Sequence, residues 1–266
     1  MSLKNYRAMP NVTLILTRHV GLSILLFVSM NHVVQAEKVS VAVASNALKA
    51  VQSIKKEFEK NTTHQLTISS GSTGKLYAQI INGAPYDVFL AANVSEPKHL
   101  EEKNMIVKNS RFTYAKGRLA LCSTTLILDK AIATQRLSTG NFNRLALANP
   151  KTAPYGAAAK EVLQKLKAWE KNKRKFIKGE NISQAYQFTA SGNVDMGFVA
   201  LAQIWNKHTS QLKKCWQVPE NYHLPLEQQA VWLKRAVNNP AAKAFVNFLK
   251  SHQVKNILSF DFGYGV

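Results

Sequence analysis

The stretch that decides the fold is ISSGSTGKLYAQIINGAPYDVFLAAN, residues 68–93. It begins as the end of a short strand, passes through a turn of serine, glycine and threonine, and continues as an amphipathic helix that starts near Lys75. A Gly-Ala-Pro sequence ends the helix, and residues 86–92 form a second apolar strand. The order of strand, polar turn, helix and strand predicts an α/β fold, in which crossover helices join parallel strands.

Hydroxyl side chains are concentrated in the turn directly before this helix: Ser69, Ser70, Ser72 and Thr73. The first backbone N–H groups of a helix have no partner within the helix, and this end carries partial positive charge. It can therefore bind an anion without any charged side chain. Simple capping is the alternative, but a cap needs one hydroxyl and this turn offers several. The pattern favours anion binding over capping alone.

A second polar turn of the same kind follows the apolar run at residues 39–44. Ser45 and Asn46 end this strand, and apolar residues at helical spacing come next, so that Asn46 is expected at the helix N-cap. In parallel sheets, ligands bind beyond the carboxyl ends of the strands. We therefore expect Ser45, Asn46, Ser72 and Thr73 to form one rim of a pocket.

The remaining pattern indicates a second lobe, and 266 residues suit two lobes better than one. Residues 112–123 form a long extended stretch with Gly117 at its middle, as expected of a connection that leaves one lobe for another. A strand at residues 145–148 then leads to a helix whose free N–H groups would come from Tyr155 and its neighbours. The expected boundaries are residues 1–36 for a leader, residues 37–115 with 232–266 for the first lobe, and residues 116–231 for the second.

The first 36 residues are interpreted as a secretory signal peptide. Three basic residues and no acidic one accompany an apolar run at residues 20–30, and Val34-Gln35-Ala36 then forms an Ala-x-Ala-like cleavage point. The run is short for a membrane-spanning helix, although an uncleaved N-terminal anchor is the alternative. We expect export and cleavage after Ala36.

Composition points to a folded, basic protein. Hydrophobic residues make up 46% of the chain and charged residues 19%, which excludes a disordered chain. The formal charge is +20, and it falls to +17 without the three basic residues of the leader. Such a charge favours anionic partners. The basic residues do not gather with aromatic ones in a nucleic-acid-binding module, and the densest run, residues 165–178, is typical of the solvated end of a helix. We expect a small anion as partner and no nucleic acid.

The two cysteines, Cys122 and Cys215, could form one disulfide in an oxidising compartment. It would join the start of the second lobe to its end. Two unpaired buried thiols are the alternative, because the spacing does not show that the two residues approach each other.

Several phrases together resemble one known family. They are VAVASN (residues 41–46), SSGSTGKLYAQIINGAPYDVFLAAN (69–93), RFTYAKGRLAL (111–121), LANPKTAPYGAAAKEVLQKL (147–166) and GFVAL (197–201). In this order they resemble the periplasmic molybdate-binding proteins of ABC transporters. The resemblance implies a type II, Venus-flytrap fold of two lobes, each with a mixed, mostly parallel sheet and flanking helices. It also implies a monomer in the periplasm that holds an oxyanion between its lobes and delivers it to an ABC permease.

The resemblance further implies the ligand set. Asn46 takes the first ligand position, which is a serine in some relatives. Thr73, with Ser72 beside it, matches the second hydroxyl position. Tyr155 and Ile182 match positions that relatives use through backbone N–H groups.

Ala200 stands where some relatives have a tyrosine, so one donor is lost, and this departure bears on ligand preference. Molybdate is a tetrahedral dianion without protons at neutral pH, and uncharged donors satisfy it. Each hydrogen bond to a charged partner contributes roughly 1.5 to 3 kcal/mol, so several converging donors can reach sub-micromolar binding. Tungstate is expected as a second ligand, sulfate or phosphate is the alternative cargo, and no cofactor or metal cation is expected.

An enzyme acting on a small anionic substrate is the remaining alternative. The sequence has no His-Glu-x-x-His, Gly-x-Ser-x-Gly or phosphate-loop motif. Asp87 and Asp195 lie in or beside apolar strands and could act as paired carboxylates, but no nucleophile accompanies them. Structural roles at strand ends are therefore expected for both.

Overall fold

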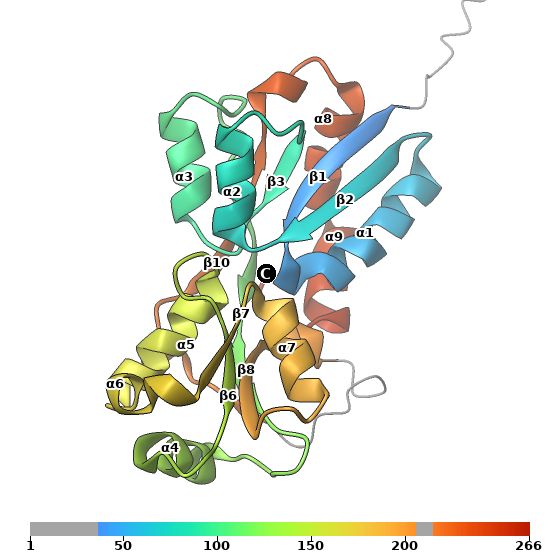
Figure 1. The fold of residues 1–266 in the computed structure, drawn as a ribbon. Coiled ribbons are helices and arrows are strands. Elements are labelled where there is room, and N and C mark those ends of the chain that lie inside the picture. The colour runs from blue at the N-terminus through green and yellow to red at the C-terminus, as the bar shows by residue number, and fades with distance from the viewer. Residues whose placement is uncertain (1–36, 206–214) are drawn as a thin grey trace, which may run out of the picture. The chain divides into compact units, whose positions relative to one another are not determined.

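The computed structural model describes residues 37–205 and 215–266 (Figure 1). The predicted signal peptide and its cleavage point after Ala36 lie outside the described residues. The described chain forms two five-stranded sheets with flanking helices, which confirms the expected α/β fold of two lobes. Within the described ranges, no helix is long and apolar enough to cross a membrane.

The first sheet has the strand order β2-β1-β3-β10-β4. Its strands are β1 (Lys38–Ala44), β2 (Gln65–Gly71), β3 (Val88–Leu90), β4 (Phe112–Gly117) and β10 (Leu226–Trp232). β1 pairs in parallel with β2 and β3, whereas β10 runs antiparallel between β3 and β4. Ala44 lies opposite Gly71 at the carboxyl ends of β1 and β2, so the two polar turns that follow these strands are neighbours, as expected.

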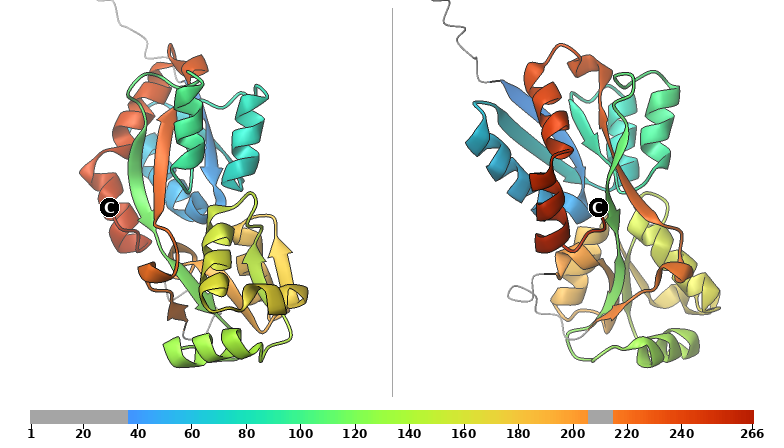
Figure 2. Two further views of the ribbon diagram at one scale, coloured as in Figure 1. Left: turned by 90° about the vertical axis from the view of Figure 1, so that its left-hand side faces the viewer. Right: turned by 180° about the vertical axis from the view of Figure 1, so that it is seen from behind.

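Helices cover both faces of this sheet (Figures 1 and 2). They are α1 (Leu48–Asn61), α2 (Thr73–Ile81), α3 (Ser95–Glu102), α8 (Pro240–Leu249) and α9 (His252–Asn256). Successive side chains of a strand point to opposite faces. Val41 and Val43 accordingly pack with residues of α1, α8 and α9, while Ala42 packs with residues of α2 and α3. The apolar stripe expected on the first helix is buried through Ile54 and Phe58.

The start of α1 differs from the prediction. A short 3-10 turn, Ser45–Ala47, separates β1 from the helix, and Ala47 occupies the N-cap. Asn46 is therefore not the helix cap, because its side chain bonds to other parts of the fold. Near the C-terminus, α8 and α9 are separate helices, because Ser251 caps α9 by accepting a hydrogen bond from the N–H of Val254.

The second sheet has the order β7-β6-β8-β5-β9 and is mixed, with parallel pairing of β6 to β7 and β8 and antiparallel pairing of β5 to β8 and β9. Its strands are β5 (Leu119–Cys122), β6 (Leu145–Ala148), β7 (Phe176–Gly179), β8 (Met196–Ala200) and β9 (Trp216–Gln217). Its helices are α4 (Lys130–Thr139), α5 (Pro154–Lys165), α6 (Trp169–Asn172) and α7 (Ile182–Ala190). The basic run at residues 165–178 continues beyond the end of α5 into α6 and β7, so it is not one helix end as expected.

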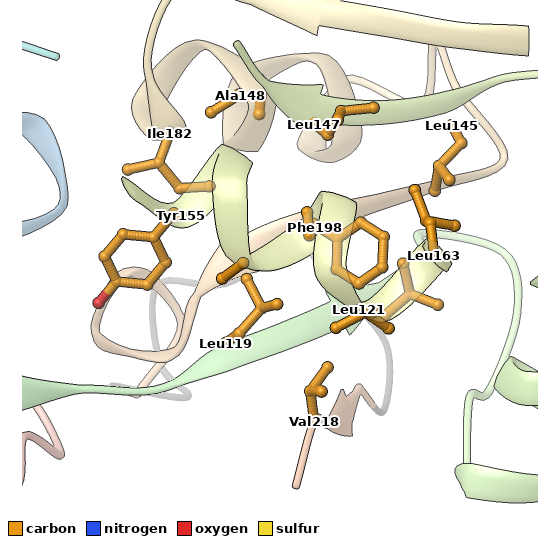
Figure 3. Close-up of a cluster of buried hydrophobic side chains, with 14 of the residues drawn as sticks. Leu119, Leu121, Leu145, Leu147, Ala148, Tyr155, Leu163, Ile182, Phe198 and Val218 are labelled. Atoms are coloured by element: carbon orange, nitrogen blue, oxygen red, sulfur yellow. The ribbon is translucent and has the colours of Figure 1, made fainter. Parts of the chain in front are cut away.

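The core of the second lobe is built from the apolar strands and α5. Leu121, Leu145 and Phe198 lie against Leu163 of α5, and all four are fully buried (Figure 3). Tyr155 lies at the edge of this cluster with its hydroxyl directed away from the leucines (Figure 3). The core therefore fixes the first turn of α5 while leaving the phenol to other partners.

The chain crosses between the sheets at Arg118 and between β9 and β10. The extended stretch expected at residues 112–123 is two strands in different sheets, β4 and β5, as suits a connection between lobes. We call β4 and β10, which lie side by side (Figure 2), the crossing strands. β4 and β10 pair from Ala230 opposite Phe112 to Leu226 opposite Gly117. Residues 116–117 and 226–231 therefore belong to the first sheet. The expected boundaries had placed both segments in the second lobe.

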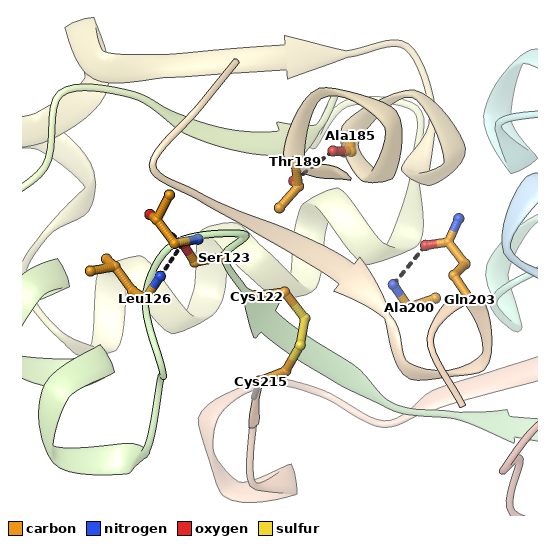
Figure 4. The surroundings of a disulfide bond; sticks show 9 residues. Cys122, Ser123, Leu126, Ala185, Thr189, Ala200, Gln203 and Cys215 are labelled. Atoms are coloured by element: carbon orange, nitrogen blue, oxygen red, sulfur yellow. Dashed lines mark hydrogen bonds between the residues drawn. A yellow bond between two sulfur atoms is a disulfide. The ribbon is translucent and has the colours of Figure 1, made fainter. Parts of the chain in front are cut away.

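The disulfide between Cys122 and Cys215 forms, with the two Cα atoms 4.5 Å apart (Figure 4). It joins the end of β5 to the residue directly before β9, and the two strands are neighbours in the second sheet. The described residues contain no free cysteine. Of the two alternatives left open by the sequence, the structure has the disulfide and not two unpaired thiols.

Candidate functional site

A small cavity lies between the carboxyl ends of strands from both lobes. The lining residues come from the turns after β1, β2, β3 and β7 and from the start of α5: Ala44, Ser45, Asn46, Gly71, Ser72, Thr73, Ala92, Ala153, Pro154, Tyr155, Asn181 and Ile182. All six residues proposed from the sequence as ligand-binding are among them. The fold thus brings together residues that are more than a hundred positions apart in the sequence.

Three helices begin at this cavity: α2, α5 and α7. No side chain caps α2 or α5, and Pro154, which has no N–H group, opens α5. α7 is capped by Asn181, whose Oδ1 accepts hydrogen bonds from the N–H groups of Ser183 and Gln184. This cap uses the second and third N–H groups of α7 and not the first, that of Ile182. The first turns therefore direct partial positive charge and N–H groups at one point.

The two hydroxyls at the start of α2 differ in their partners. The Oγ1 atom of Thr73 accepts a hydrogen bond of 3.1 Å from the N–H of Ala92. The Oγ atom of Ser72 is buried and has no hydrogen-bond partner among the described residues. Burying a polar group without a partner costs roughly 1 to 3 kcal/mol. Ser72 is therefore the hydroxyl that a bound ligand would satisfy most directly, while Thr73 keeps its proton to donate.

Asn46 lines the cavity, but its side-chain NH₂ group points into the protein. The Nδ2 atom donates to Oε1 of Gln228 at 2.8 Å and to Oη of Tyr264 at 3.1 Å. In this arrangement, what Asn46 can donate to the cavity is its backbone N–H. Tyr264 also donates from Oη to the carbonyl of Asn46 at 3.1 Å, which fixes the turn from both sides.

Sequence reasoning missed Gln228, Tyr114 and Tyr264, which lie behind the cavity in this buried network. Two glutamines follow Glu227 in the segment LEQQAVW of β10 and lead directly into apolar residues, and this contrast was the available signal. The tail FDFGYGV that contains Tyr264 has no periodicity to mark it.

The tyrosines near the cavity are uncharged. Burial raises the pKa of Tyr114, Tyr155 and Tyr264 well above the usual 10, and for Tyr114 and Tyr155 the charge that Tyr264 would carry raises the pKa further. Hydrogen bonds from Asn46 and Gln228 oppose this effect at Tyr264 without reversing it. The phenols are therefore neutral near pH 7 and do not repel an anion.

Within the part of the chain that the structure describes, no charged side chain lines the cavity. An ion pair between Lys75 and Glu180 lies close by and joins α2 of the first lobe to the residue before Asn181 of the second. Two hydrogen bonds also join the lobes here, from the N–H of Gly74 to the carbonyl of Thr152 at 2.9 Å and from Oγ of Ser183 to the carbonyl of Ser45 at 3.0 Å. The cavity is thus bordered on several sides by contacts between the lobes.

The aspartates considered as paired carboxylates lie directly before strands of different sheets, Asp87 before β3 and Asp195 before β8, and neither lines the cavity. Asp87 accepts hydrogen bonds from the N–H of Ser40 and from Arg235, and Asp195 accepts one from the N–H of Arg144 at 3.0 Å. Both fix strand ends, as expected. Among the described residues, no group of three or more His, Cys, Asp or Glu side chains could hold a metal ion.

Comparison with known proteins identifies the family of the chain. The chain is 43% identical over 87% of its length to the molybdate-binding protein ModA of Azotobacter vinelandii, of which it covers 91%. It is 40% identical over 86% of its length to ModA of Rhodobacter capsulatus, of which it covers 88%. The solved periplasmic molybdate-binding protein of A. vinelandii matches with a TM-score of 0.80 and 36% identity, over 86% of this chain and 99% of that one. The family model described as bacterial extracellular solute-binding protein matches residues 39–264. The chain belongs to this family of bacterial extracellular solute-binding proteins.

Proposed function

We propose that this protein captures molybdate, and tungstate as well, in the cavity between its lobes and delivers the anion to an ABC permease. The observation that carries the proposal is the buried hydroxyl of Ser72, which lies in a cavity where three helices begin. Among the residues described, this hydroxyl has no hydrogen-bond partner and no charged side chain lines the cavity. The names of the two similar ModA proteins support molybdate as the cargo. Family membership also excludes the enzyme alternative, because these proteins are non-enzymatic components of transporters.

The proposed ligand set contains only neutral donors. Ser72 and Thr73 donate from their hydroxyls, the backbone N–H groups of Tyr155 and Ile182 donate from helix first turns, and the turn at Ser45 and Asn46 closes the rim. Roughly 1.5 to 3 kcal/mol per hydrogen bond to a charged partner is enough for tight binding of a dianion. Tungstate has the same charge and tetrahedral shape, so the same donors suit it.

Phosphate and sulfate are disfavoured for different reasons. Phosphate carries a proton near pH 7 that needs an acceptor, and N–H groups cannot supply one. A hydroxyl oxygen of Ser72 or Thr73 would have to accept it instead of donating to the anion. Sulfate is an unprotonated dianion like molybdate, so charge and protonation do not distinguish the two, and only its smaller size would exclude it. A sulfate-binding protein of Mycobacterium tuberculosis shares the fold with a TM-score of 0.67 at 12% identity, and this likeness concerns the fold alone.

The predicted leader and the family description together support a location outside the cytoplasm, in the periplasm. We infer that the protein acts there as a monomer after cleavage following Ala36. Its remaining partner is then the permease, which takes the anion when the lobes separate.

Binding is tested by calorimetry and thermal unfolding of the chain from residue 37 onward with molybdate, tungstate, sulfate and phosphate. A ligand at a hundred times its Kd stabilises the protein by about 2.7 kcal/mol. We expect this stabilisation with molybdate and tungstate. Stabilisation by sulfate or phosphate alone would show that the proposed cargo is wrong. No stabilisation by any of the four anions would show that the cavity is not an anion-binding site.

Ser72→Ala tests the placement of the anion. Loss of one donor to a charged ligand should weaken molybdate binding about 10-fold or more, because the hydroxyl contributes roughly 1.5 to 3 kcal/mol. Ser70→Ala is the matched control, since Ser70 is exposed and does not line the cavity. Equal affinities for the two variants would show that the anion lies elsewhere.

A further inference from the structure

Gln228 is a fully buried polar residue on the crossing strand β10 that does not line the cavity. A buried primary amide is costly unless its oxygen and its NH₂ group both find partners. The register of β10 against β4 shifts between Gln228 and Gln229, so the regular pairing is interrupted at this residue. Strand pairing alone therefore does not explain why a glutamine is buried at this position.

The side chain of Gln228 bonds on both sides. Its Oε1 accepts hydrogen bonds from Nδ2 of Asn46 at 2.8 Å and from Oη of Tyr114 at 3.0 Å. Its Nε2 donates to Oη of Tyr155 at 3.2 Å. Asn46 belongs to the first lobe and Tyr155 to the second, and both line the cavity. The side-chain amide of Gln228 is thus hydrogen-bonded to one cavity residue of each lobe, Asn46 and Tyr155.

Close packing at the crossing makes this contact possible. A Cβ atom at Gly117, the last residue of β4, would lie 2.1 Å from Oη of Tyr155 and 2.6 Å from Nε2 of Gln228. Only glycine leaves room for the phenol to reach the amide at the point where the chain leaves the first sheet. Tyr264 completes the network on the other side of Asn46.

We propose that Gln228 is a positioning residue for anion binding, which orients the turn at Asn46 and the first turn of α5 at Tyr155 toward one another. This inference rests on the proposed function, because the two segments that Gln228 holds are part of the proposed ligand set. Affinity then depends on a side chain that does not touch the anion. The bond from Gln228 to Tyr155 also joins the lobes, so it forms together with the closed cavity.

The test compares Gln228→Leu with Gln229→Leu, which is a matched control on the same strand. Gln229 is also buried and hydrogen-bonded, to Arg111 and to Thr113, but it contacts neither Asn46 nor Tyr155. Both variants should lower the melting temperature of the ligand-free protein. Calorimetry with molybdate should give a Kd raised 10-fold or more for Gln228→Leu and changed less than 2-fold for Gln229→Leu.

Gln228→Glu gives a readout that a purely structural role would not change. A buried carboxylate cannot donate to Tyr155 and repels the dianion, whereas its protonated form is neutral and can donate. The variant should therefore bind molybdate more tightly at pH 6 than at pH 8, while the parent protein binds equally at both. The pH dependence of Gln228→Glu also tests the inference if Gln228→Leu does not fold.

A double-mutant cycle with Tyr155→Phe completes the test. Once Gln228→Leu has removed the amide, loss of the phenol should raise the Kd no further, so the two effects should not add. Equal Kd changes for the leucine variants at positions 228 and 229, no pH dependence in Gln228→Glu, or additive effects in the cycle would each overturn the inference. A parent protein that binds sulfate instead of molybdate would overturn the proposed cargo alone, and the same variants would then be compared with sulfate. A parent that binds none of the four anions would overturn both.

Discussion

At the scale of single residues, the three buried tyrosines show how the fold keeps a polar network uncharged. Tyr114 has its pKa raised mainly by burial, and its hydroxyl donates to Gln228. A raised pKa in the folded state means that the folded protein keeps a proton that the unfolded chain releases above pH 10. The stability that this group contributes is complete below pH 10 and is lost as the pH rises beyond it.

Tyr114→Phe should therefore change the pH dependence of stability. Each such tyrosine lowers the free energy of unfolding by about 1.4 kcal/mol per pH unit above pH 10, and the variant lacks one of these contributions. Urea unfolding of the ligand-free protein from pH 8 to pH 11 should show a less steep decline for Tyr114→Phe. Parallel declines would mean that the phenol of Tyr114 ionises in the folded protein as readily as in the unfolded chain.

At the scale of elements, the caps of α7 and α8 are built alike but stand in different places. Asn181 caps α7 at the cavity, and Asn239 caps α8 by accepting from the N–H groups of Ala241 and Ala242, away from the cavity. Comparing variants of the two caps can therefore distinguish the contribution of a helix cap to stability from its contribution to anion binding.

Asn181→Ala and Asn239→Ala should each lower the free energy of unfolding by about 0.5 to 2 kcal/mol, the usual cost of a lost N-cap. Asn181→Ala should in addition weaken molybdate binding several-fold, because the N–H of Ile182 is less firmly held when the first turn of α7 frays. Urea unfolding measures the first effect and calorimetry the second. A Kd that stays at the parent value in Asn181→Ala would show that α7 does not contribute to the site.

The disulfide is the second test at this scale. Cys122 and Cys215 are 93 positions apart, and neither lines the cavity. Replacing both by serine should lower the free energy of unfolding by about 2 to 4 kcal/mol, since a long loop in the unfolded chain is no longer closed. The Kd for molybdate should stay within 2-fold of the parent value. A large loss of affinity would instead mean that the bond shapes the second lobe around the cavity.

At the scale of the whole described chain, the contacts that join the lobes are few and varied. The exposed pair Lys75–Glu180 lies near the cavity. Away from the cavity lining, Nε1 of Trp205 in the second lobe donates to the carbonyl of Phe260 in the first at 2.9 Å. Exposed ion pairs contribute little, about 0 to 1 kcal/mol, and salt screens them. A weak pair at this place suits lobes that close on an anion and must later release it.

Glu180→Gln should accelerate molybdate dissociation by at most about 5-fold, as expected for the loss of up to 1 kcal/mol, and high salt should remove the difference. Stopped-flow fluorescence measures the rate. Glu102→Gln is the matched control, because it breaks the exposed pair with Lys98 within the first lobe. An identical change in both variants would show that the pair between the lobes has no part in closure.

The sequence by itself determined the order of strands, polar turns and helices, and it placed Ser45, Asn46, Ser72 and Thr73 at strand ends. These are local properties, since apolar periodicity and helix-start residues act over a few positions. Their meeting with Tyr155 and Ile182 was inferred from a family resemblance and not from periodicity.

Only the tertiary structure decided that β10 belongs to the first sheet, that Asn46 does not cap α1, and that Gln228 joins the lobes. The bonds of Gln228 and Tyr264 to Asn46 span 182 and 218 positions, and that of Gln228 to Tyr155 spans 73. Partners at such distances are selected by packing of the whole fold, in which a buried amide must find every donor and acceptor it needs. A glutamine in a buried strand needs hydrogen-bond partners, and only the folded chain shows which residues these are.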